Sequence, residues 1–168
     1  MKECAEMKTT VVILAAGEGT RMKSNTPKSL HRVAGKSMLR HIVDASSNID
    51  PDQLMVVHSP NTESAIKKEL FETKTILVQQ NKPLGTGDAL KAAYPAIEKN
   101  NAVIVLLGDV PLIKQKTINQ LKLKLLENKL TILTIEVEKP EGYGRIIRDD
   151  KGLISAIVEE NECSESQK

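Results

Sequence analysis

The chain has 168 residues, 40% of them hydrophobic and 27% charged, with a formal net charge of +2. This length suits one domain, and so small a net charge does not indicate nucleic-acid binding. No apolar stretch approaches the roughly 20 residues of a membrane-spanning helix. Because aromatic residues make up only 2%, we expect an aliphatic core, as in a parallel sheet covered by helices.

The two cysteines lie near opposite ends of the chain, at Cys4 and Cys163, and form neither a CxxC pair nor a disulfide framework. A reducing cytoplasm is therefore the expected location, and three scattered histidines do not favour a histidine metal site. We expect a short N-terminal extension over residues 1–8, one domain over residues 9–160 and a polar, acidic tail over residues 161–168.

Apolar runs that fit buried strands alternate with segments of helical spacing. In chain order, the pattern predicts a strand at 10–15, a helix at 37–47, a strand at 53–58, a helix at 62–71, a strand at 75–79, a helix at 86–99, a strand at 102–107, a helix at 115–128 and strands at 130–137, 146–148 and 153–158. The helix at 86–99 is expected to kink or end early at Pro95.

Strands that alternate with long helices imply crossover connections and a mostly parallel sheet, which places the chain in the α/β class. Such sheets bind ligands beyond the carboxyl ends of their strands. We therefore looked for a site among the residues that directly follow each predicted strand.

The first predicted strand leads into a glycine loop, LAAGEGTRM, at residues 14–22. Met22 stands where a GxGxxG motif has its last glycine, and no Walker A lysine follows. Residues 20–43 hold several basic side chains and no Asp or Glu, which fits either a solvated loop or a phosphate-binding segment. The two cations just past the glycine turn, Arg21 and Lys28, favour phosphate binding over an ordinary tight turn.

Asp109 follows the most strand-like run in the chain, within the sequence GDVPL. A carboxylate there is poorly solvated unless another group pairs with it. It fits either a turn ahead of Pro111 or an oxygen ligand for Mg²⁺ shared with substrate phosphates, and the spacing leaves both open.

Two further loops carry polar or glycine-rich patterns. Gln80 follows the third strand, and its amide can match the donor–acceptor edge of uracil, while Thr86 is expected to cap the next helix. The sequence GYGR at residues 142–145 fits either a hairpin-like turn or a bend with close backbone approach.

Taken together, LAAGEGTRM, PKSLH, LGTG, GDVPL, GYGRI and IVEE resemble, in order and spacing, one nucleotidyltransferase family. The family that these motifs resemble is the uridyltransferase domain of bifunctional N-acetylglucosamine-1-phosphate uridyltransferase/glucosamine-1-phosphate acetyltransferase. The resemblance implies a three-layer α/β/α, Rossmann-like nucleotide-diphospho-sugar transferase fold with a mostly parallel sheet, incomplete at its C-terminus. It also implies that Mg²⁺ is the cofactor and that UTP and N-acetylglucosamine 1-phosphate are the substrates, for cell-wall precursor synthesis.

The resemblance assigns a role to each matching residue. Arg21 and Lys28 would be the catalytic cations that hold the triphosphate and the developing pyrophosphate, and Asp109 would bind Mg²⁺. The nucleotide would contact Leu14, Ala15, Ala16, Gly17, Gln80, Gly85, Thr86 and Gly108. The sugar would contact Gly144 and Glu159.

The sequence also departs from that family. Leu107 stands where a tyrosine is common, and the chain stops before the family's later sugar and metal ligands and its acetyltransferase domain. We therefore expect either a truncated gene product or one half of a split gene, and in the second case another polypeptide would supply the remaining half. The alternative functions are a non-catalytic nucleotide-binding remnant and a related nucleotidyltransferase with a different NTP and sugar phosphate.

Overall fold

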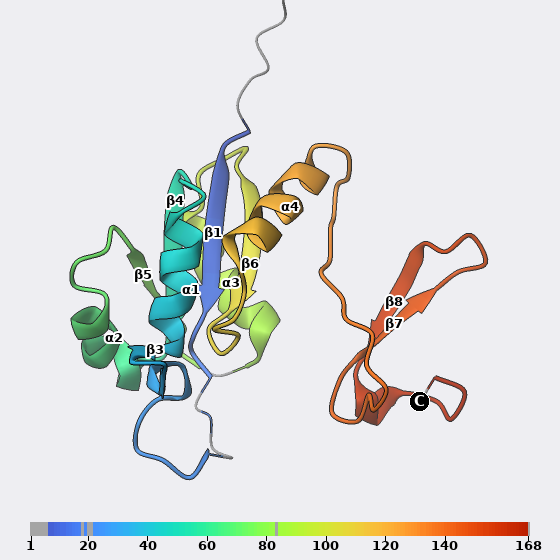
Figure 1. Cartoon of the computed structure of the whole chain (residues 1–168), viewed down its shortest axis with the longest axis horizontal. Helices are drawn as coiled ribbons and strands as arrows, with labels where there is room; N and C mark the ends of the chain where they lie inside the picture. The colour runs from blue at the N-terminus through green and yellow to red at the C-terminus, as the bar shows by residue number, and fades with distance from the viewer. Residues whose placement is uncertain (1–6, 18, 20–21, 83, 168) are drawn as a thin grey trace, which may run out of the picture. The chain divides into compact units, whose positions relative to one another are not determined.

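The computed structural model describes residues 7–17, 19, 22–82 and 84–167 (Figure 1). The chain divides into two compact units, Met1–Thr131 and Ile132–Lys168, and each is described by itself. These units are defined by internal packing, so the family domain expected over residues 9–160 remains a prediction.

The first unit is built on a four-stranded parallel sheet with the order β5-β4-β1-β6. Its strands are β1 (Thr9–Leu14), β4 (Gln53–His58), β5 (Ile76–Gln79) and β6 (Ala102–Leu107). The chain places successive strands to one side of β1 and then crosses to the other side for β6. The carboxyl ends of β1 and β6 therefore form a topological switch point, where open parallel sheets bind ligands.

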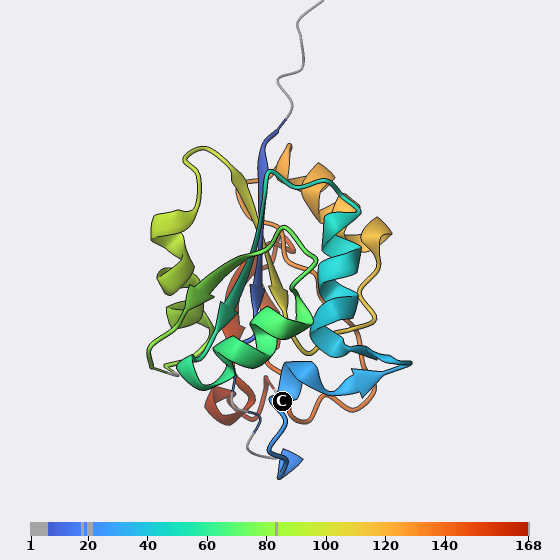
Figure 2. The ribbon, with the colours of Figure 1, turned by 90° about the vertical axis from the view of Figure 1, so that its left-hand side faces the viewer.

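Helices cover both faces of this sheet, which confirms the three-layer α/β/α arrangement (Figure 2). The helices are α1 (Met38–Ser47), α2 (Glu63–Glu69), α3 (Thr86–Ala93) and α4 (Gln115–Leu125). Side chains of β1 alternate between the two faces, as a strand requires. Ile13 packs in the core shared with α1, α2 and α4, whereas Val12 packs in the core shared with α3.

The ends of the helices follow local chemistry. Ser37 caps α1 by accepting a hydrogen bond from the Arg40 backbone N–H at 3.0 Å. α3 ends at Ala93 and passes into the short 3₁₀ turn Tyr94–Ala96, which confirms the early end expected at Pro95. The predicted cap at Thr86 is wrong, because Thr86 is the first residue of α3 and Gly85 occupies the cap position.

Shorter elements complete the first unit. They are the 3₁₀ turn Lys28–Leu30, the antiparallel pair β2 (Arg32–Val33) and β3 (Lys36–Ser37), and the 3₁₀ turn Pro60–Thr62. No helix in the described part of the chain has the length and apolar character to cross a membrane.

The second unit contains an antiparallel hairpin of β7 (Arg145–Arg148) and β8 (Ile154–Val158), followed by the 3₁₀ turn Glu160–Glu162. The two short strands were predicted from the sequence and are confirmed. Asp149 closes the turn between them, because its Oδ1 accepts hydrogen bonds from the backbone N–H groups of Lys151 and Leu153, both at 2.9 Å.

The strand predicted at residues 130–137 is wrong. A strand is stable when neighbouring backbone satisfies its N–H and C=O groups, and no ladder pairs this segment with another described segment. Its apolar side chains are largely exposed, including Leu130 at 75% and Ile135 at 65%. High strand propensity without a pairing partner therefore leaves the segment irregular.

Candidate functional site

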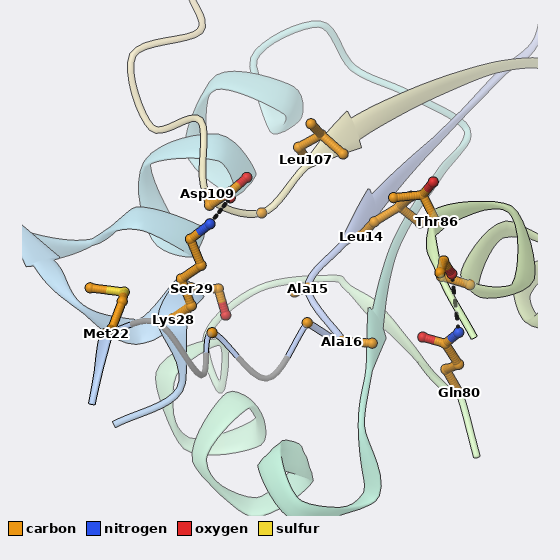
Figure 3. Close-up of a pocket in the computed structure, with 15 residues that line it drawn as sticks. Leu14, Ala15, Ala16, Met22, Lys28, Ser29, Gln80, Thr86, Leu107 and Asp109 are labelled. Carbon is orange, nitrogen blue, oxygen red and sulfur yellow. Dashed lines mark hydrogen bonds and ion pairs between the residues drawn. The ribbon is translucent and has the colours of Figure 1, made fainter. Parts of the chain in front are cut away.

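A cavity of about 630 Å³ lies in the first unit, at the carboxyl ends of β1, β5 and β6 (Figure 3). Its walls come from the loop after β1, the start of α3 and the turn after β6. The predicted site residues that line it are Leu14, Ala15, Ala16, Gly17, Lys28, Gln80, Gly85, Thr86, Gly108 and Asp109. Residues from four separate sequence segments therefore meet at the switch point of the sheet.

The loops after β1 and β6 are held against each other by backbone contacts. The Gly108 N–H donates a hydrogen bond to the Leu14 carbonyl at 2.8 Å. A Cβ atom at Gly108 would lie 2.9 Å from that carbonyl oxygen and 3.0 Å from the Ala15 Cβ. Glycine is needed here because any side chain would push the two loops apart and reshape the cavity wall.

Lys28 and Asp109 form an ion pair in the cavity, with Lys28 Nζ 2.5 Å from Asp109 Oδ2 (Figure 3). The turn after β6 is closed by backbone bonds, such as Val110 N–H to the Leu107 carbonyl at 3.3 Å. The Asp109 carboxylate instead faces Lys28, so its negative charge is compensated in a partly buried site. Among the described residues that line it, the cavity thus has one cation that can bind phosphate, Lys28, and one carboxylate that can bind a metal ion, Asp109.

Gln80 forms the opposite side of the cavity and is only 4% exposed. Its backbone N–H donates to the His58 carbonyl at 2.8 Å, which ties it to the end of β4. Its side-chain Nε2 lies 2.7 Å from Asp88 Oδ2 and 3.3 Å from the Gly85 carbonyl oxygen. The Gln80 side chain is therefore fixed against the first turn of α3.

Several residues at the site were not assigned a role from the sequence. Ser29 lines the cavity next to Lys28, and its buried hydroxyl has no hydrogen-bond partner among the described residues. The other lining residues without a predicted role are Gly19, Met22, Ala89 and Leu107. The position of Ser29 inside the PKSLH motif was the available signal for its place in the wall.

The remaining predicted site residues do not lie in this cavity wall as described. Arg21 is outside the described residues. Gly144 and Glu159 belong to the second unit, where an added Cβ at Gly144 would lie 3.9 Å from Glu159 Oε2. These two residues are neighbours across the β7–β8 hairpin, and their roles in sugar binding remain predictions.

The charged groups of the cavity do not form a metal cluster of their own. In the described part of the chain, no group of three or more His, Cys, Asp and Glu side chains is arranged to hold a metal ion. A metal bound at Asp109 would therefore take most of its ligands from water or substrate.

The model of the MobA-like NTP transferase domain family matches residues 11–149, which include every described residue that lines the cavity. The chain belongs to this family. Family membership makes the chain a nucleotidyltransferase.

Two curated relatives match the chain over almost its whole length. It is 45% identical over 162 residues to the bifunctional protein GlmU of Pseudomonas entomophila (strain L48), and 45% identical over 159 residues to GlmU of Nitrosomonas eutropha. These matches cover 96% and 94% of the chain but 35% of each relative, so the chain spans about a third of their length. They confirm the resemblance found in the motifs and give no support for a second polypeptide.

Two solved structures are similar to the chain in fold. HddC from Yersinia pseudotuberculosis is 27% identical with a TM-score of 0.70, over 90% of this chain and 69% of that one. The 4-diphosphocytidyl-2C-methyl-D-erythritol synthase of Anaerococcus prevotii DSM 20548 is 19% identical with a TM-score of 0.67, over 90% and 64% of the two chains. The α/β nucleotide-diphospho-sugar transferase fold expected from the sequence is confirmed.

Proposed function

We propose that this NTP transferase joins the uridylyl group of UTP to N-acetylglucosamine 1-phosphate, giving UDP-N-acetylglucosamine and pyrophosphate for cell-wall precursor synthesis. The observation that carries the proposal is the Lys28–Asp109 pair beside the glycine loop, at the switch point of the sheet. The 45% identity to GlmU supports this choice of substrates within the family.

The proposed reaction needs positioning and charge neutralisation rather than a general base. The phosphate of the sugar 1-phosphate is already an anionic nucleophile, and its oxygen attacks the α-phosphorus of UTP in line with the leaving pyrophosphate. Aligning two bound reactants and neutralising the phosphate charge therefore supply most of the rate enhancement. In this proposal Lys28 and Arg21 neutralise the triphosphate, and the loop at Leu14–Gly17 supplies backbone contacts at close range.

The donor set of the cavity fits Mg²⁺. This ion commonly keeps several waters and binds one or two carboxylates together with substrate phosphates, so the single carboxylate of Asp109 suffices on the protein side. When bound, the ion would neutralise charge on the phosphates of the nucleotide. Asp109 would be the side chain that holds the ion, and the Lys28 ammonium group would contact phosphate.

The test is pyrophosphate release from UTP, N-acetylglucosamine 1-phosphate and Mg²⁺. We expect Asp109→Asn to reduce the rate by about 100-fold or more, because a group that stabilises transition-state charge is lost. Asp150→Asn is a matched control, since Asp150 is an exposed acid in the β7–β8 turn. An unchanged rate in Asp109→Asn would show that the metal assignment is wrong.

Two other outcomes separate the alternatives. Binding of UTP by folded protein without any turnover would support the nucleotide-binding remnant over the enzyme. Faster turnover of CTP or GTP than of UTP in a nucleotide panel would contradict the proposed uridylyl transfer.

A further inference from the structure

The orientation of the Gln80 amide determines whether this side chain offers a ligand in the cavity a hydrogen-bond donor or an acceptor. A glutamine side chain has a carbonyl oxygen that accepts hydrogen bonds and an amino group that donates two. Rotating the amide by 180° exchanges these roles, so the neighbours of Gln80 determine which of them faces a ligand.

Both neighbours of the amide are acceptors. The Gln80 Nε2 lies 2.7 Å from the carboxylate of Asp88 and 3.3 Å from the backbone carbonyl of Gly85. These two contacts use both amino hydrogens, and the reversed amide would place its oxygen against two other oxygens. The carbonyl oxygen is consequently turned away from Asp88 and toward the Ala16 side of the cavity (Figure 3).

Of the two neighbours, Asp88 provides the stronger constraint. Its contact is shorter and charge-assisted, whereas the Gly85 carbonyl also accepts the Ala89 N–H of α3 at 3.1 Å. Asp88 lies in the first turn of α3, where the helix dipole favours a carboxylate. The helix dipole therefore favours the charged carboxylate at the position where it accepts the Gln80 hydrogen bond.

We propose that Asp88 is a positioning residue that locks Gln80 as a hydrogen-bond acceptor and so sets the base preference of the site. The inference rests on the proposed function, since it concerns the nucleotide of the same cavity. Uracil has an N3–H donor that matches the Gln80 carbonyl, whereas cytosine has an N3 lone pair that would face it. A cytosine base would leave two acceptors opposed in a buried position.

The test is equilibrium binding of UTP and of CTP, each with Mg²⁺, to the full chain by titration calorimetry. We expect the wild-type protein to bind UTP roughly tenfold more tightly than CTP, as for one mismatched buried hydrogen bond. In Asp88→Asn we expect the two affinities to fall within about threefold, because an asparagine amide can pair with either orientation of Gln80.

A matched control is Glu63→Gln, which removes an acid from the first turn of α2 whose carboxylate pairs with Lys67. It is expected to keep the wild-type preference for UTP. Asp88→Glu, which restores a carboxylate acceptor, is expected to recover part of that preference.

A double-mutant cycle shows whether Asp88 acts through Gln80. Gln80→Met removes the amide, and adding Asp88→Asn to it should leave the ratio of UTP to CTP affinity unchanged. Thermal unfolding of each variant shows that the protein is folded. Asp88→Ser replaces Asp88→Asn if the latter does not unfold cooperatively.

The outcomes separate this inference from the proposed function. Wild-type preference retained by Asp88→Asn would overturn the role of Asp88, and so would equal binding of CTP and UTP by the wild-type protein. Binding of neither nucleotide by folded wild-type protein would overturn the proposed function, and the inference with it.

Discussion

The two units of the chain contain similar apolar runs but bury them very differently. In β1 of the first unit, every residue from Thr9 to Ile13 is buried, and Ile13 is 0% exposed. In β8 of the second unit, Ile154 is 42% exposed and Ile157 is 58% exposed. Among the described residues of the second unit, Cys163 alone is buried.

The number of neighbouring layers explains this difference. β1 has a paired strand on each side and helices on both faces, so each of its side chains meets a packed surface. In the described structure β7 and β8 pair only with each other, and an isolated two-stranded hairpin is marginally stable in water. A run of β-branched residues therefore forms a strand in both units, but it forms a core only where other layers cover it.

The largest expected effect contrasts two isoleucines at comparable places in their strands. Ile13→Ala should lower the free energy of unfolding by about 2–5 kcal/mol, because it leaves a cavity in a packed core. Ile157→Ala, on the exposed face of the hairpin, should cost about 0.5 kcal/mol or less. Urea unfolding followed by far-UV circular dichroism measures both, and equal losses would show that the second unit has a core of its own.

The same reasoning separates what the sequence predicted from what it did not. The strands and helices of the first unit were predicted to within a few residues at most ends, because buried parallel strands are continuous apolar runs and amphipathic helices have a clear period. The cavity residues could be predicted from position alone, since Gly17, Gln80 and Asp109 each come soon after a strand of one sheet. The parallel topology brings those strand ends to the same edge.

Features that depend on strand pairing or on the exact path of a loop could not be predicted. Residues 130–137 have strand propensity, but pairing is a tertiary property and is missing there in the described structure. The contact of Asp88 with Gln80 crosses a loop whose path the sequence does not specify. Thr86 does not cap α3, because it is the first residue of the helix and Gly85 takes the cap position.

A smaller effect contrasts two glycines, one in each unit. Gly108→Ala should cost about 1–3 kcal/mol and weaken UTP binding, because its Cβ would meet the Leu14 carbonyl at 2.9 Å in the cavity wall. Gly152→Ala has open space around it but a φ of +78°, so it should cost about 1 kcal/mol and leave UTP binding unchanged. Unfolding and nucleotide titration together distinguish them. A loss of UTP binding in Gly152→Ala would contradict the assignment of the nucleotide site to the first unit.

The smallest expected effect concerns charge rather than packing in the first unit. Asp44 accepts hydrogen bonds from Lys36 Nζ at 2.7 Å and Arg40 Nε at 2.8 Å. Burial raises the pKa of the Asp44 carboxyl, but these two contacts together lower it more, so the pKa lies below its ordinary value. A carboxyl with a depressed pKa stabilises the folded state above its unfolded pKa of about 4, and this stabilisation is lost as the pH falls through the folded pKa.

Asp44→Asn should therefore lower the free energy of unfolding by about 0.5–1 kcal/mol near pH 7, a modest value because the ion pairs are partly exposed. The difference from wild type should shrink below about pH 4 and vanish below the folded pKa, where Asp44 is protonated in both states. Urea unfolding at a series of pH values measures this. A difference that stayed constant down to low pH would mean that Asp44 contributes through packing, as Ile13 does. In that case van der Waals contact, and not charge, would account for the contribution of Asp44 to the stability of the first unit.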